Sequence, residues 1–143
     1  MLDANILISY LLTVRPESAP TAIIHAALNR RYTLLLPEEL FLEVRRRVAT
    51  KLYLSARIAP ADIERFRAIL AAAGEGVPPL RGPLPEQGRD RKDDYLLACA
   101  HRDGADYLIT RDHDLLDLPA SSLSFTIVLP GEFLRLARNA AIL

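Results

Sequence analysis

Four acidic residues occupy positions that a parallel α/β sheet would bring close together. Asp3 ends the first expected strand, and Asp112 lies two residues beyond the expected strand that ends at Thr110. Glu43 is on the second turn of a helix that follows another strand, and Asp94 begins a later helix. All these places are at the carboxyl edge of the sheet, where open α/β folds bind ligands.

Carboxylates that converge at one edge repel one another and raise each other's pKa. A divalent cation removes this repulsion, and hard oxygen ligands favour Mg²⁺ or Mn²⁺ over zinc. Each acid alone also has a simpler interpretation. Asp3, Asp94 and Asp112 are suited to caps, helix starts or loops, and Glu43 can pair with Arg46 or Arg47 on a solvated helix face. Their joint order favours a magnesium or manganese site.

The elements that position the acids are short strands alternating with amphipathic helices. Strands are expected at 1–3, 33–36, 107–110 and 125–129. Helices are expected at 18–29 and from the starts marked by Pro37, Pro60 and, approximately, Pro130. A further helix is expected from Asp93 or Asp94 to about Arg102, ending before Gly104. This alternation predicts a three-layer α/β/α fold with a central parallel sheet. The stretch 74–88 is expected to be a long irregular connection within one domain, residues 1–143.

Length and composition exclude several classes of protein. The chain has 143 residues, 50% hydrophobic and 25% charged, which excludes disorder and allows one domain with a real core. No apolar run approaches the ~20 residues that span a bilayer, and no signal peptide is visible, so a cytoplasmic location without membrane contact is expected. Eighteen basic residues balance eighteen acidic ones, so net charge alone does not indicate a nucleic-acid partner. Cys99, the single cysteine, is expected to be buried and inert.

In their order and spacing, the acidic motifs resemble those of the PIN-domain family, and specifically of the PIN-domain toxins of prokaryotic toxin–antitoxin pairs. The matching segments are 2–9, 38–44, 89–98 and 105–116, and 127–133 resembles the family's closing strand and helix. The resemblance spans nearly the whole chain. The last two acidic motifs together are the most specific part of it.

The resemblance implies a metal-dependent nuclease that cleaves RNA phosphodiester bonds. It implies a catalytic cluster of four acids, namely Asp3, Glu43, Asp94 and Asp112. It implies that four aspartates bind the metal, namely Asp3, Asp94, Asp112 and Asp114. Two polar residues, Asn5 and Thr110, would have a supporting role. The Mg²⁺ or Mn²⁺ ion of such an enzyme lowers the pKa of bound water, orients it and stabilises the leaving oxygen.

RNA binding has to come from residues outside the acidic cluster. Arg45, Arg46 and Arg47 lie on the helix that carries Glu43, and Arg111 is beside Asp112. Arginines in these places are suited to phosphate contacts that position a strand without reading its sequence. The alternatives are a solvated helix face for the first three and contact with a cognate antitoxin protein. The resemblance and the apolar character of 134–143 also predict a homodimer.

Two other functions compete with the nuclease. One is a catalytically inactive PIN-like domain that binds RNA or a partner protein, and the very short first strand, with only Met1 and Leu2 before Asp3, favours it. The other is phosphoryl transfer through an aspartyl phosphate. That chemistry needs a lysine near the site, and neither Lys51 nor Lys92 is at an expected strand end.

Overall fold

The computed structural model describes residues 1–13, 15–82 and 93–143. In chain order the elements are α1 (Ala4–Leu12), α2 (Ala19–Leu28), β1 (Leu35–Pro37), α3 (Glu38–Thr50), α4 (Leu52–Ser55), α5 (Pro60–Ala73), β2 (Glu75–Val77), α6 (Asp94–Arg102), β3 (Tyr107–Ile109), α7 (His113–Leu116), the 3₁₀ helix η2 (Ala120–Ser122), β4 (Thr126–Val128) and α8 (Pro130–Asn139). The mixed α/β class predicted from the sequence is confirmed.

The strands are parallel, as predicted, but within the described residues they form two pairs and not one continuous sheet. β1 pairs with β2, and β3 pairs with β4. The expected first strand is reduced to a single parallel bridge between Leu2 and Ile109, because Asp3 is already the N-cap of α1. β2 lies inside the stretch 74–88 that was expected to be irregular, and the part of that stretch from 83 to 88 lies outside the described residues.

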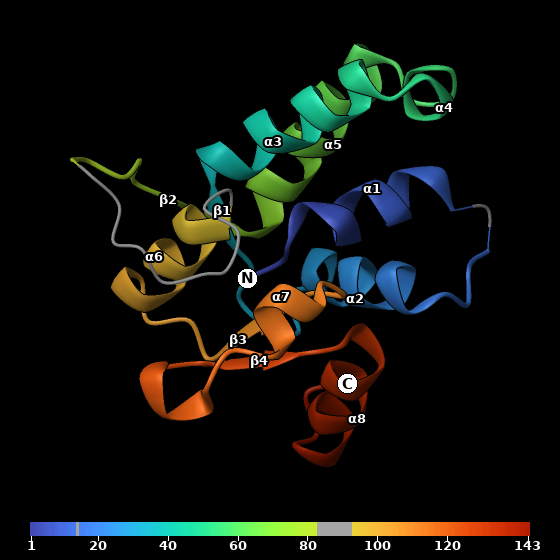
Figure 1. The fold of residues 1–143 in the computed structure, drawn as a ribbon. Coiled ribbons are helices and arrows are strands. Elements are labelled where there is room, and N and C mark those ends of the chain that lie inside the picture. Colours follow the sequence, from blue (N-terminus) through green and yellow to red (C-terminus); the bar gives the residue numbers. More distant parts are fainter. Residues whose placement is uncertain (14, 83–92) are drawn as a thin grey trace.

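Helices cover both faces of β3, as a three-layer fold requires. Ile109 belongs to the larger hydrophobic core, which is built mainly from α1, α2, α3, α5 and α8. The neighbouring Leu108 belongs to a second core, which includes Leu96 and Leu97 of α6. Successive side chains of a strand point to opposite faces, so β3 separates the two cores. The N-terminus lies in the middle of the molecule, between the long α3 and α5 helices and the β3–β4 pair (Figure 1).

Local signals place most helix ends where the sequence predicted them. The Ser18 side chain accepts a hydrogen bond from the Thr21 backbone N–H at 3.3 Å and begins α2. Pro60 begins α5, and the Asp62 carboxylate accepts a hydrogen bond from the Ala59 N–H at 2.9 Å. α6 ends at Arg102, shortly before Gly104, whose φ of +66° is a left-handed conformation suited to a helix terminus.

The packing of Cys99 and of the last helix bears on two of the sequence predictions. Cys99 is fully buried, as expected. In the segment 134–143, whose apolar character suggested a homodimer, Leu134 and Ala137 are buried in the core together with Phe133. The exposed face of α8 carries charged residues, including an Arg135–Glu132 ion pair at 3.8 Å. Within the described residues, no helix combines the length and apolar character needed to cross a bilayer.

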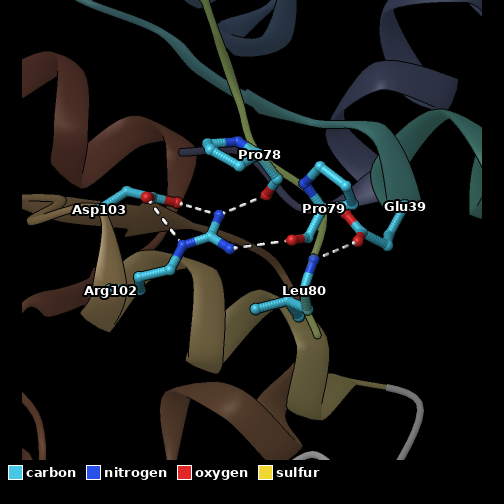
Figure 2. A network of polar contacts seen from close by, with 6 residues as sticks. All are labelled: Glu39, Pro78, Pro79, Leu80, Arg102 and Asp103. Carbon is cyan, nitrogen blue, oxygen red and sulfur yellow. Dashed lines mark hydrogen bonds and ion pairs between the residues drawn. The ribbon is translucent and has the colours of Figure 1, made fainter. Parts of the chain in front are cut away.

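The segment after β2 is attached to two helices (Figure 2). The Arg102 guanidinium at the end of α6 donates to the Pro78 carbonyl at 2.6 Å and to the Pro79 carbonyl at 3.4 Å. From the start of α3, Glu39 accepts a hydrogen bond from the Leu80 N–H at 3.0 Å. These contacts hold the segment between the two helices that carry Glu43 and Asp94.

Candidate active site

Asp3 is a buried carboxylate held by two neighbours. It is 1% exposed and is the N-cap of α1. Its Oδ2 atom accepts hydrogen bonds from the Thr110 hydroxyl at 2.6 Å and from the Asn5 side-chain amide at 3.0 Å. Its Oδ1 atom is buried and, within the described part of the chain, receives no hydrogen bond. Asn5 and Thr110, expected as supporting groups, thus fix the orientation of Asp3.

Thr110 connects Asp3 to the fourth acidic motif. Its hydroxyl oxygen accepts a hydrogen bond from the Asp112 backbone N–H at 3.0 Å while the same hydroxyl donates to Asp3. Asp112 is partly exposed and caps α7, where its Oδ1 accepts from the Asp114 N–H at 2.9 Å. The Asp114 residue itself is exposed. The fully buried Thr110 therefore links the Asp3 carboxylate to the backbone of Asp112 at the end of β3.

Glu43 is a buried acid and not a residue of a solvated helix face. It is 4% exposed, and one carboxylate oxygen accepts a hydrogen bond from the Tyr95 hydroxyl. The other oxygen pairs with the Arg47 guanidinium at 2.8 Å, one helical turn along α3. Of the two arginines considered as its helical partner, Arg47 is the one that makes the ion pair.

Asp94 is also buried, at 3% exposure, and is the first residue of α6. The adjacent Tyr95 bonds to Glu43, so the beginning of α6 is attached to α3 next to the acidic site. The preceding Asp93 is 2% exposed. Residues 89–92, which complete the third sequence motif, lie outside the described residues.

Burial and neighbouring charge shift the pKa of two groups in the site. Burial raises the pKa of Asp3 above its ordinary value, and the charge of Glu43 raises it further. The Thr110 hydrogen bond and the Arg47 charge act in the opposite direction. Burial, followed by the charge and hydrogen bond of Glu43, raises the pKa of Tyr95. Asp3, Glu43 and Tyr95 therefore share one electrostatic environment, although they come from three different helices or helix ends.

The donor chemistry of the site fits a divalent cation at Asp3. Besides Asp3 Oδ1, the side-chain oxygen of Asn5 is buried without a hydrogen-bond donor among the described residues. A buried acceptor without a partner is costly, and such hard oxygens are the ligands that Mg²⁺ and Mn²⁺ take. In residues 1–13, 15–82 and 93–143, however, no three His, Cys, Asp or Glu side chains are gathered as a metal site.

The arginines expected to bind RNA have different surroundings. Arg45 forms ion pairs with Glu64 of α5 at 3.5 Å and with Glu38 at 4.0 Å. Arg46 is exposed and lines a pocket of about 300 Å³ together with Glu39, Leu42, Glu43 and Tyr95. Arg111 is exposed and donates to the Ser9 hydroxyl at 3.2 Å. Arg46 and Arg111 are therefore the two candidates next to the acids.

Tyr95 is the contact residue that sequence reasoning missed. It stands in an apolar run, where an aromatic residue is read first as part of the core. A buried tyrosine hydroxyl nevertheless needs a hydrogen-bond partner, and the preceding Asp94 was a signal that the ring lies near the acids.

The chain has a family match. No curated protein matches it, but the family profile described as PIN domain matches residues 1–114. The matched range begins before Asp3 and ends at Asp114, so it contains every acid proposed for the site. The match covers well over half of the chain, and the protein therefore belongs to the PIN-domain family.

Proposed function

We propose that this protein is an endoribonuclease that hydrolyses RNA phosphodiester bonds with the help of Mg²⁺ or Mn²⁺. PIN domains are generally nucleases, and the chain belongs to that family. The observation that carries the proposal is the state of Asp3. This carboxylate is buried, is oriented by Thr110 and Asn5, and keeps one oxygen without a donor among the described residues.

Four aspartates are proposed to hold the metal, namely Asp3, Asp94, Asp112 and Asp114. When bound there, the cation would lower the pKa of a water molecule and stabilise the leaving oxygen. The Thr110 hydroxyl donates to Asp3 and accepts from the backbone N–H of Asp112, and so orients both. Glu43, held by Tyr95, supplies the remaining buried negative charge of the site.

The exposed arginines beside the acids are proposed to bind the RNA backbone. Arg46 lies next to Glu43 in the pocket, and Arg111 follows Thr110 directly. Guanidinium groups bind phosphate with bidentate hydrogen bonds and do not read sequence. Arg45 was also expected to contribute, but its ion pairs with Glu38 and Glu64 compete with that role.

The biological setting is proposed from the motif resemblance. We propose that the protein is the toxin of a toxin–antitoxin pair, acts in the cytoplasm and forms a homodimer. Its partners would be an RNA substrate and a cognate antitoxin. The support is the order of the acidic motifs along the chain, which resembles that of the PIN-domain toxins.

A second candidate function is a PIN domain that binds RNA or a protein without cleaving RNA. Two observations favour it. No three acids are gathered as a metal site in the described part of the chain, and the charge of Glu43 is already balanced by Arg47.

Cleavage of a labelled mixture of single-stranded RNAs distinguishes the two functions. We expect cleavage with Mg²⁺ or Mn²⁺ and none with EDTA. Asp94→Asn and Asp112→Asn should each lose roughly 100-fold or more in rate, as is typical when an electrostatic catalytic group is removed. Asp117→Asn is the matched control, because Asp117 is an exposed acid at the other end of α7 and should keep the wild-type rate.

Circular dichroism must show that each variant is folded. Cleavage at the wild-type rate by both Asp94→Asn and Asp112→Asn would contradict the proposed acidic site. If the folded wild-type protein binds RNA but cleaves it neither with Mg²⁺ nor with Mn²⁺, the result would favour the binding domain.

A further inference from the structure

Arg47 places a positive charge inside the acidic site. Its guanidinium is 2.8 Å from a Glu43 carboxylate oxygen, and its side chain is 32% exposed while that of Glu43 is 3% exposed. The charge of Arg47 also lowers the pKa of Asp3 and of Tyr95. A single guanidinium therefore acts on three groups of the site, although only Glu43 is in direct contact with it.

The adjacent arginines do not share this arrangement. Arg45 is directed to Glu38 and to Glu64 on α5. The Arg46 side chain makes no ion pair or hydrogen bond with any described residue, although it lines the pocket beside Glu43. Both Arg46 and Arg47 have helical spacing from Glu43, since residues three and four apart lie on the same face, but only the Arg47 guanidinium is in contact with its carboxylate. Arg47 is therefore the one of the three that makes the contact that neutralises Glu43.

A buried carboxylate is stable only if its charge is compensated. Glu43 obtains this compensation from the Tyr95 hydroxyl and from Arg47. A divalent cation close to Asp3 would be attracted by the same Glu43 charge, because the charges of Asp3 and Glu43 act on each other. It would also be repelled by the Arg47 guanidinium. The two cations therefore oppose each other at this site.

We propose that Arg47 is a built-in counter-cation, which holds Glu43 in the metal-free protein and competes with the divalent cation for the site. The proposal rests on the metal dependence of the proposed function. Arg47 is in this role a positioning residue that acts through Glu43. It compensates the Glu43 carboxylate in the metal-free fold, and it weakens metal binding in return.

Mn²⁺ binding to EDTA-treated protein, measured by isothermal titration calorimetry, tests the proposal without any cleavage assay. Arg47→Gln should bind Mn²⁺ about tenfold more tightly than wild type, the change that corresponds to ~1.4 kcal/mol. Arg46→Gln is the matched control, because it removes the same charge from the neighbouring position without breaking an ion pair, and its Mn²⁺ affinity should stay within about twofold of wild type.

Thermal denaturation gives a second readout on the same variants. In EDTA, Arg47→Gln should unfold at a lower temperature than wild type, because Glu43 is left buried without its partner. Saturating Mn²⁺ should raise its unfolding temperature by more than it raises that of wild type. Arg47→Lys keeps the charge but not the planar guanidinium, so its Mn²⁺ affinity should lie between those of wild type and Arg47→Gln. This variant tests the proposal if Arg47→Gln does not fold.

Combining Arg47→Gln with Glu43→Gln tests whether the effect of Arg47 on Mn²⁺ affinity depends on the Glu43 charge. Without the charge for which the cations compete, adding Arg47→Gln should change the Mn²⁺ affinity by less than about twofold. Equal or weaker Mn²⁺ binding by Arg47→Gln in the otherwise wild-type chain overturns the counter-cation role and leaves the nuclease proposal in place. Absence of Mn²⁺ binding by wild type and all variants overturns both.

Discussion

The charge of Asp3 opposes folding in the absence of metal. Burial, and then the charge of Glu43, raise the pKa of this carboxyl above its ordinary value of 3.8. The folded chain therefore binds this proton more tightly than the unfolded chain does. Under that condition the free energy of unfolding falls as the pH rises through the interval between the unfolded and the folded pKa.

Replacing Asp3 with a neutral residue of the same shape should relieve this penalty. In EDTA at pH 7, Asp3→Asn should raise the unfolding temperature, by roughly 2–4 °C for each kcal/mol of relieved repulsion. The side-chain carbonyl oxygen of the substituted residue can still accept the hydrogen bonds from Thr110 and Asn5. Thermal denaturation at pH 7 and at pH 4 checks the effect, which should be smaller at pH 4 because the raised pKa of the wild-type carboxyl increases the protonated fraction in the folded state as the pH falls.

Asp117→Asn, which changes an exposed acid, should show no comparable gain at pH 7. An Asp3→Asn protein that unfolds at a lower temperature than wild type at pH 7, or whose advantage grows at pH 4, would contradict this account of Asp3.

At the residue scale, the roles of the four acids stay predictions, while their contact partners were predicted only in part. Thr110 and Asn5 were expected as supporting groups from the family resemblance, and both donate hydrogen bonds to Asp3. The Tyr95 contact joins residues 52 positions apart. No local pattern encodes such a pair, because it depends on how α6 packs against α3.

At the scale of elements, helix ends were predictable and strands were predictable only in part. Ser18, Pro60 and Gly104 act on the backbone within one turn, so the sequence shows them directly. β2, whose sequence is Glu75–Val77, has one apolar residue in three and is recognisable only through its pairing with β1. The four-residue helices α4 and α7 were not predicted, because they are too short to show a periodicity.

The contacts of the segment after β2 give a prediction at this scale (Figure 2). Arg102→Gln should lose the hydrogen bonds to the Pro78 and Pro79 carbonyls, while the bond from Leu80 N–H to Glu39 remains. Because 34% of the Arg102 side chain is exposed to solvent, the expected loss of stability is only about 0.5–1 kcal/mol. Amide hydrogen exchange at Leu80 should become faster, since this segment opens more readily than the core.

Arg65→Gln is the matched control for Arg102→Gln. Arg65 pairs at 2.6 Å with Asp62 on the same helix and is 74% exposed, so its loss should change stability by less than about 0.5 kcal/mol. Unchanged exchange at Leu80 in Arg102→Gln would show that the segment is held by other contacts.

At the scale of the whole molecule, alternating strands and helices were sufficient to predict a parallel α/β fold. They were not sufficient to predict how far the strands pair. Each strand of the two pairs has three residues. Ile109 and Leu108 of β3 each join a separate hydrophobic cluster, on opposite faces of the strand. Packing on both faces therefore holds β3 in place with little strand pairing.

Self-association is a property of the whole molecule. The helix that first suggested it, α8, buries its apolar face within the chain. Among the residues that the structure describes, the large apolar side chains with the highest exposed fractions are on α4, where Leu52 is 84% exposed and Tyr53 is 60% exposed. Adjacent exposed apolar side chains are typical of contact surfaces. We therefore expect the proposed homodimer to use α4.

Light scattering coupled to size-exclusion chromatography should give, at micromolar concentration, twice the 15.9 kDa mass of one chain. Leu52→Glu should reduce this mass to that of one chain, because a charge at the centre of an apolar contact is desolvated without a partner. Leu129→Glu is the control, since Leu129 is 44% exposed but lies before α8 and away from α4 in sequence and in fold. A wild-type mass of one chain contradicts the homodimer. A dimeric Leu52→Glu protein would instead retain the homodimer and exclude α4 as its interface, because a buried unpaired glutamate there would not be tolerated.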